Sequence, residues 1–123
     1  RLGFRFPIRV THLLLSTDIW VSALIRRAEI EGAYATVVRR GDPRGGAVIV
    51  KAFDTSTRRA RLFTEAFGLD GERQWIQPVS SEMEGELDAY VGRQVGYDPD
   101  LWVVEIEDRQ GRHFIDGKVA DQA

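Results

Sequence analysis

The residues best suited to catalysis lie in one apolar run near the C-terminus, residues 102–108. In an extended strand Glu105 and Glu107 would point to the same face, about 7 Å apart at about 3.3 Å per residue. Carboxylates so placed can hold a divalent metal or act as acid and base. With His113 following, and Asp98 and Asp100 preceding, the run is compatible with a metal-dependent hydrolase.

Alternation gives the same run a purely structural interpretation. Trp102, Val104 and Ile106 would fill the core, and the odd-numbered residues 103, 105 and 107 would face outward, opposite arginines of neighbouring strands. His12 and His113 are the only imidazoles and the chain has no cysteine. A zinc site would need acidic ligands whose spacing shows no pattern. No phosphate-binding glycine motif or serine nucleophile elbow is present. We therefore expect no cofactor, no metal and no catalytic residues.

A second group of candidate residues is basic. Residues 39–61 carry seven positive and two negative side chains, a net charge of +5, whereas residues 80–108 carry nine negative and one positive, a net charge of −8. Guanidinium groups bind carboxylates and phosphates through paired hydrogen bonds. Trp75, beside a glycine-containing loop, is the tryptophan expected to be partly exposed and to anchor an interface. The candidate binding residues are Arg39, Arg40, Arg44, Arg58, Arg59, Arg61 and Trp75.

These opposed charges allow several arrangements. They can face each other within one fold, pair between subunits, or leave one basic and one acidic surface. The arginines could also contact nucleic-acid phosphates, but they are not interleaved with aromatic residues and the whole chain has a net charge of −2. We interpret the chain as a non-enzymatic interaction module whose partner is a second copy or an acidic protein. Nucleic-acid binding and the Glu105/Glu107 hydrolase are the alternatives.

Length and composition place the chain among small globular domains. It has 123 residues, of which 43% are hydrophobic and 29% charged, values typical of a single domain. The absence of cysteine fits a reducing compartment, and no apolar run is long enough to cross a bilayer. We expect a cytoplasmic protein with no membrane association.

Two helices are predicted from periodicity and end signals. The first follows the possible N-caps Ser16, Thr17 and Asp18 and ends before Gly32. The second follows Ser81, which with Glu84 matches a capping box, and ends at Gly96. The expected core stripe of the first helix is Ile19, Trp20, Ala23, Leu24 and Ala28.

Strands are predicted at residues 34–40, 47–53, 60–66 and 101–106, with shorter ones at 73–78 and 112–115. The glycine-containing segment 41–46 is typical of a hairpin turn. Short connections between successive strands favour an antiparallel meander. We expect an α+β fold with an antiparallel sheet of four to six strands, a meander plus the C-terminal strand, and two helices packed on one face. Residues 15–116 would form the domain, with an N-terminal arm at 1–14 and a tail at 117–123.

Three blocks of sequence resemble one known family. They are residues 15–23 (LSTDIWVSA) with Arg26 and Arg27 following, residues 37–43 (VVRRGDP) and residues 98–109 (DPDLWVVEIEDR). Each is similar to the bacterial "domain of unknown function 1491" family, and the similarity spans residues 15 to about 116. The resemblance implies a compact, cytoplasmic bacterial domain, and it brings no activity, cofactor or assigned site.

Overall fold

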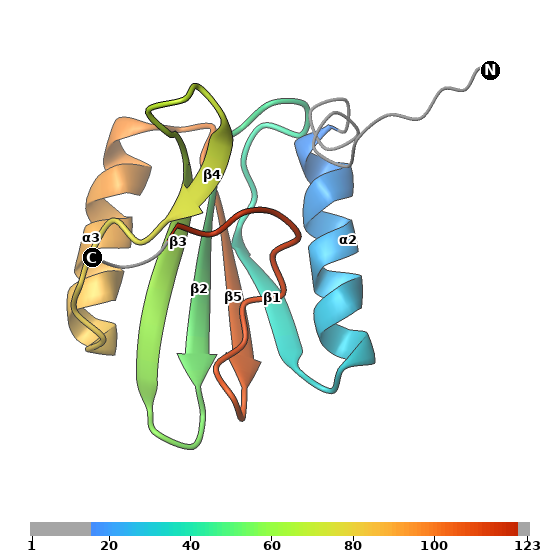
Figure 1. Cartoon of the computed structure of the whole chain (residues 1–123), viewed down its shortest axis with the longest axis vertical. Helices are drawn as coiled ribbons and strands as arrows, with labels where there is room; N and C mark the ends of the chain where they lie inside the picture. The colour runs from blue at the N-terminus through green and yellow to red at the C-terminus, as the bar shows by residue number, and fades with distance from the viewer. Residues whose placement is uncertain (1–15, 121–123) are drawn as a thin grey trace.

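The first helix forms where its end signals predict it. A computed structural model describes residues 16–120, and in it α2 spans Thr17–Ile30 (Figure 1). Ser16 is the N-cap residue, but its hydroxyl donates to Asp18 Oδ1 (2.6 Å) instead of capping a backbone N–H. Gly32 follows the helix with φ +90°, which favours glycine. Ile19 was expected in the core and is 54% exposed, whereas Val21 is buried.

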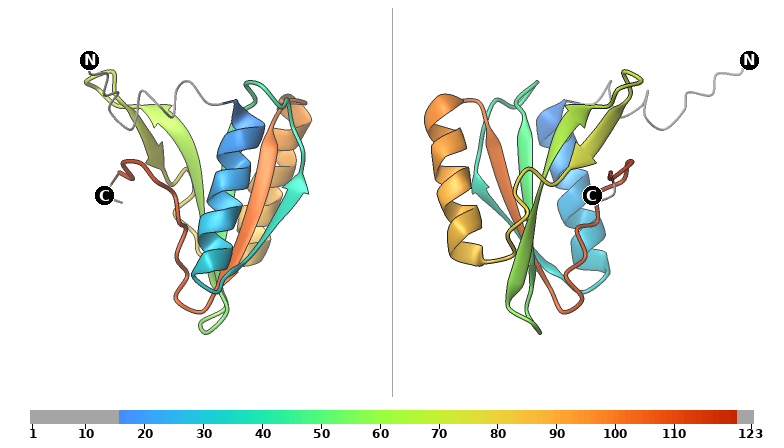
Figure 2. Two further views of the ribbon diagram at one scale, coloured as in Figure 1. Left: turned by 90° about the vertical axis from the view of Figure 1, so that its right-hand side faces the viewer. Right: turned by 60° about the vertical axis from the view of Figure 1, so that its left-hand side comes forward.

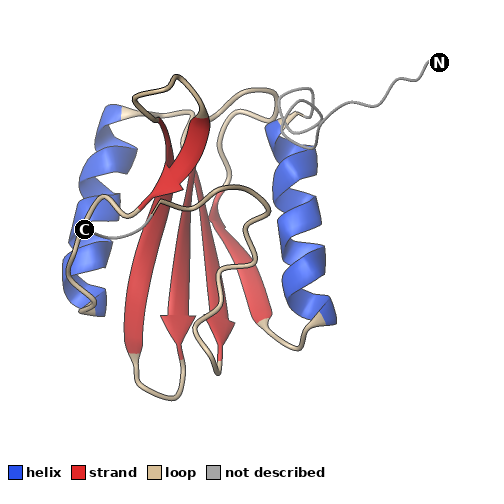
Figure 3. Ribbon diagram, in the orientation of Figure 1, coloured by secondary structure: helices blue, strands red, loops and turns tan. Residues whose placement is uncertain are grey.

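The sheet is mixed, so the prediction of a purely antiparallel sheet is wrong. Its strands lie in the order β1-β5-β2-β3-β4, and every neighbouring pair is antiparallel except β2 and β5 (Figure 3). The C-terminal strand β5 lies between β1 and β2, because a strand buried on both faces suits the centre of a sheet. Residues 112–115, predicted as a strand, form none. The strand bounds are β1 Tyr34–Arg39, β2 Val48–Asp54, β3 Arg59–Phe67, β4 Arg73–Ile76 and β5 Trp102–Asp108.

The segment 41–46 therefore joins two strands that are not neighbours, and the predicted hairpin is wrong. Its glycines serve close packing: a Cβ on Gly41 or Gly46 would overlap the carbonyl oxygen of Asp100. The segment is bound to the start of β5, since Asp42 N donates to Asp100 O (3.0 Å). Trp102 Nε1 in turn donates to Asp42 O (2.7 Å).

The two helices cover opposite faces of the sheet (Figure 2), not one face as predicted. All β2 residues from Val48 to Phe53 are buried, and a sheet buried on both sides needs a layer on each. The core beneath α2 includes Trp20, Leu24, Val50, Phe63 and Val104. The core beneath α3 (Glu84–Tyr97) includes Leu87, Ile49, Leu62 and Val103.

The start of α3 differs from the predicted capping box. Met83 is the N-cap residue, and Ser81 Oγ accepts a hydrogen bond from Met83 N (3.1 Å) outside the helix. Glu84 is thus the first helical residue, and its carboxylate contacts the lysine of β2 instead of the helix terminus. Neither described helix has the length and apolar content that a bilayer crossing requires.

The C-terminal segment returns along β4. Trp75 N donates to Lys118 O and Ala120 N donates to Trp75 O, both at 2.8 Å, and Trp75 forms a parallel bridge with Val119. This segment therefore covers the outer edge of β4 at Trp75. The predicted arm at residues 1–14 lies outside the described residues.

Candidate interaction surface

The six candidate arginines do not form one patch. Arg39 is the last residue of β1, and Arg40 and Arg44 follow it. All three lie near the start of β5, because β1 runs antiparallel to β5. The other three precede or begin β3 at the opposite end of the sheet, where β2 and β5 finish. The antiparallel strands thus separate a segment that is continuous in sequence into two groups, Arg39/Arg40/Arg44 and Arg58/Arg59/Arg61.

The second of these groups is largely engaged within the chain. Arg59 pairs with Glu82 (3.2 Å) and Arg61 Nη2 donates to Gly111 O (2.8 Å). Arg58 has φ +63° in the β2–β3 turn and lies over the Phe53 ring. Arg59 and Arg61 line an open cleft of about 350 Å³, but Asp54 and Glu82 line it too. Its lining therefore carries no excess of positive charge.

The first group makes fewer internal contacts. Arg39 Nη2 donates to Pro99 O (2.9 Å). The Arg40 guanidinium lies 4.9 Å from the centre of the Trp102 ring, and its side chain is exposed. Arg44 contributes its backbone carbonyl, which accepts from Thr17 N (3.2 Å). This end of β1 thus presents cationic side chains.

Trp75 is buried, contrary to the expected partial exposure. It stacks on Trp20 with ring centroids 5.1 Å apart, and residues 118–120 cover it from the strand edge. Both contacts come from distant parts of the chain, so nothing near Trp75 in the sequence indicated them. Trp75 is therefore a core residue.

The structure does not bring the three hydrolase candidates together. Glu105 and Glu107 share the α3 face with Val103, as the strand periodicity predicts. His113 packs on Phe63, in the core of the α2 face (4.8 Å between ring centroids), where burial and the Arg61 charge lower its pKa. Val103, expected to face outward, is buried beneath α3. Among the described residues no group of three or more acids and histidines could hold a metal.

The acidic segment instead surrounds a residue that the sequence analysis missed. Lys51 lies in the middle of β2 with its side chain 3% exposed. Its Nζ is 2.7 Å from Glu84, 2.8 Å from Asp88 and 3.4 Å from Glu105. Burial disfavours the lysine charge, but hydrogen bonds to the α3 carboxylates and the charge on β5 outweigh it and raise the Lys51 pKa. A lysine within an otherwise apolar strand was the available signal.

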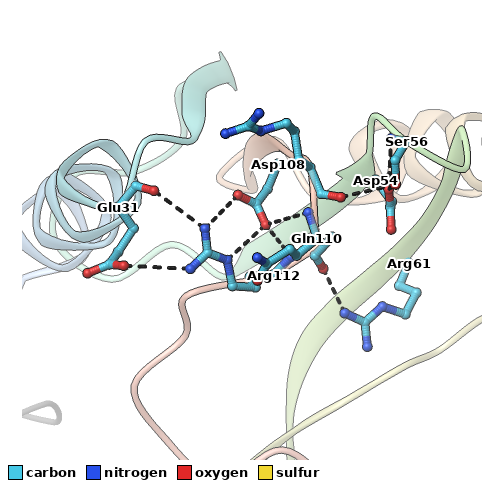
Figure 4. A network of polar contacts seen from close by, with 9 residues as sticks. Glu31, Asp54, Ser56, Arg61, Asp108, Gln110 and Arg112 are labelled. Carbon is cyan, nitrogen blue, oxygen red and sulfur yellow. Dashed lines mark hydrogen bonds and ion pairs between the residues drawn. The ribbon is translucent and has the colours of Figure 1, made fainter.

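A second polar network closes the far end of β5 (Figure 4). The Asp108 carboxylate accepts from the Arg112 side chain at 2.9 and 3.0 Å, and from the N–H groups of Gln110 and Arg112. Arg112 also contacts Glu31 (3.6 Å) at the end of α2. The Arg112 guanidinium and these N–H groups hold the pKa of the buried Asp108 down at about 2.

We expect Asp108→Asn to lower the free energy of unfolding by about 2 kcal/mol at pH 7, because a pKa depressed from 3.8 to about 2 stabilises the fold by about that amount. A depressed folded pKa gives stability that is present above pH 3.8 and is lost as pH falls through about 2. Urea titrations from pH 7 down to pH 2 would measure this loss in the free energy of unfolding. The variant should show a shallower decline below pH 4 than the wild type. Asp70→Asn, which removes an exposed carboxylate from the β3–β4 loop, is the control, and an unchanged pH slope in Asp108→Asn would contradict the assignment.

The remaining open feature is the outer edge of β1. No described strand pairs with this edge, since β1 ends the sheet order. Tyr34 is 65% exposed and Val38 55% exposed, and the left view of Figure 2 shows β1 at the margin of the sheet beside α2. Beside the start of β1 lies a cleft of about 240 Å³ lined by Glu31, Tyr34 and Glu107 among others. We call the β1 edge, this cleft and the Arg39/Arg40 end the β1 surface.

Fold and surface together define a small α+β domain with one open sheet edge among the described strands. A family model, "Protein of unknown function (DUF1491)", matches residues 15–116, and the chain belongs to this family. Among curated proteins, none matches.

Solved structures of bacterial relatives share the fold. A crystal structure of a DUF1491 family protein from Caulobacter crescentus CB15 is 64% identical, with a TM-score of 0.85, and the match covers 87% of this chain and all of that one. An NMR structure of a DUF1491 family protein from the same organism is 63% identical (TM-score 0.82, 88% of this chain and 98% of that one). The solution structure of protein Atu0922 from A. tumefaciens is 29% identical (TM-score 0.70, 89% and 98%).

Proposed function

We propose that this domain is a cytoplasmic, non-enzymatic protein-interaction module that pairs the edge of β1 with a strand of a protein partner. The observation that carries the proposal is the open edge itself. The open edge of a strand offers N–H and C=O groups to an added strand, and natural proteins usually blunt such edges with charges, proline, bulges or cover. In β1 the bulge and the charge both lie at the end of the strand, at Val37 to Arg39. Residues 34–38 are Tyr-Ala-Thr-Val-Val, without charge or proline.

The contrast with β4 supports this proposal. At that end of the sheet the chain supplies its own cover, because residues 118–120 bond to Trp75. The bulge between Val37 and Arg39 shortens the regular part of β1 and leaves Val38 exposed. Exposed aromatic and β-branched side chains on an edge give an added strand apolar contacts as well as hydrogen bonds.

The alternatives have less support from the geometry. A hydrolase built on Glu105, Glu107 and His113 would need side chains from both faces of the sheet. Nucleic-acid binding by the whole arginine set would need a ligand that reaches both ends of the sheet. Part of the charge asymmetry is also neutralised internally, because Lys51 and Arg59 pair with acids of residues 82–105.

A photo-crosslinking amino acid at position 38, introduced in bacterial cells, tests the proposal. We expect a protein adduct at position 38 and none with the same group at position 69, a fully exposed leucine in the β3–β4 loop. In the protein that carries the crosslinker at position 38, the additional substitution Tyr34→Lys should reduce the amount of adduct about tenfold. The reason is that burying an ammonium group at the interface costs at least about 1.4 kcal/mol. Equal adducts at both positions, or none at 38, would refute the proposal.

A further inference from the structure

We propose that the strand added to β1 is β1 of a second copy of this chain, in antiparallel orientation, with Arg39 of each copy contacting Glu107 of the other. This inference rests on the proposed function and names its partner. It starts from the charges at the two ends of β1. Glu107 of β5 lies beside Tyr34 at the start of the strand, and Arg39 is the last residue of the strand.

Antiparallel pairing of two identical edges brings these opposite ends together. A two-fold axis perpendicular to the sheet places the end of β1 in one copy beside the start of β1 in the other. Arg39 of each copy then approaches Glu107 of the other, and this happens twice in one dimer. A parallel arrangement would instead place like charges together.

The faces of the strands agree with this contact. In the β1–β5 pair, Tyr34 lies opposite Glu107 and Arg39 lies opposite Val103. Opposite residues point to the same face of the sheet, so all four side chains belong to the α3 face. The two-fold axis keeps that face on one side of the extended sheet. If Tyr34 lies opposite Arg39 of the second copy, two strand spacings of about 4.8 Å separate the Arg39 and Glu107 backbones. The two long side chains together span this distance.

The cleft at the start of β1 is suited to a guanidinium. Tyr34 offers an aromatic ring and Glu107 an exposed carboxylate that makes no ion pair among the described residues. Two arginines also line the cleft, and one of them, Arg112, is paired with Asp108 and Glu31. Arginine combines hydrogen bonds to carboxylates with contacts over aromatic rings. Among the described residues Arg39 makes one side-chain hydrogen bond, from Nη2 to Pro99 O, and its Nε is buried. The contact with Glu107 therefore falls to Nη1.

The expected association is weak and reversible. β1 has six residues, and one pair of such strands buries less area than the roughly 1,600 Å² of a standard stable interface. The dimer should therefore depend on concentration. Because its charge pairs lie at the rim, it should also weaken with salt.

Sedimentation equilibrium of the full chain, from micromolar to millimolar concentrations, tests the pairing. We expect Arg39→Glu and Glu107→Arg each to weaken dimerisation at least about tenfold. An equimolar mixture of the two variants should dimerise about as well as the wild type. In that heterodimer, position 39 of each copy again carries a charge opposite to that at position 107 of the other copy. Restoration by mixing also shows that both variants are folded.

Arg93→Glu and Glu86→Arg make the same charge changes on α3 and are the matched controls. These two variants should leave the dissociation constant of the dimer unchanged. A wild-type chain that stays monomeric while position 38 crosslinks another protein would overturn this inference and leave the proposed function standing. A wild-type dimer that the Arg39 and Glu107 variants do not affect would also overturn it. A monomer without any crosslink at position 38 would overturn both.

Discussion

Lys51→Ala should lower the free energy of unfolding by about 3 kcal/mol at pH 7, because it removes the cation that three carboxylates share and truncates a buried side chain. The carboxylates of Glu84, Asp88 and Glu105 are partly exposed, and their hydration keeps the loss below that of a fully buried cluster. Urea denaturation would measure it. Arg59→Ala, which breaks the exposed pair with Glu82, is the control and should cost less than about 1 kcal/mol.

The pH dependence separates the charge of Lys51 from its packing. A raised folded pKa means that the lysine's contribution is fully present below pH 10.5 and is lost only as pH rises through the raised value. The wild type should therefore keep this contribution throughout the neutral range. Lys51→Met fills the same space without the charge, so its deficit should shrink in acid, where protonation relieves the carboxylate repulsion. A deficit that does not vary with pH would show that the lysine acts by packing alone.

Gly46→Ala should cost about 3 kcal/mol, at the upper end for overpacking, because the new methyl group meets backbone and not a flexible side chain. Its Cβ would overlap Asp100 O and lie 3.0 Å from Trp102 Cδ1. The loop 41–46 would have to move away from the start of β5. This movement would also affect the adjoining Arg39/Arg40 end of the β1 surface. Thermal or urea unfolding would measure the loss.

Gly45→Ala is the control for this substitution. Its Cβ would meet only Asp42 Oδ2, at 3.9 Å, and the expected change is within about 0.5 kcal/mol. Equal losses at positions 45 and 46 would indicate that the loop needs glycine for its backbone flexibility, as the hairpin interpretation supposed. A loss confined to position 46 would identify close packing on β5 as the cause.

Local signals predicted most of the elements. Helical spacing between Ser16 and Gly32 marked α2, and apolar runs bounded by turn residues marked β2 and β3 to within about two residues. The capping box failed because Ser81 lies outside the helix, where it bonds to Met83 N. The capping box was predicted from residue types alone, whereas in the fold Met83 is the N-cap residue and the Glu84 carboxylate bonds to Lys51.

The candidate site was less predictable. The six arginines are exposed or half-buried, but their grouping depended on strand direction, which sends residues 39–44 and 58–61 to opposite ends of the sheet. Trp75 was misjudged because its cover comes from Trp20 and residues 118–120. Lys51 was missed, although its place inside an apolar strand should have prompted a search for carboxylates.

The sequence by itself determined the family, the two helices, the charge asymmetry and five of the six predicted strands, since each depends on neighbouring residues and their periodicity. Only the tertiary structure decided that β5 lies between β1 and β2, that the helices cover opposite faces, and that β1 is an open edge. The physical reason is that periodicity shows which side of a strand is apolar. It does not show which strand, of the several with similar apolar sides, becomes its neighbour.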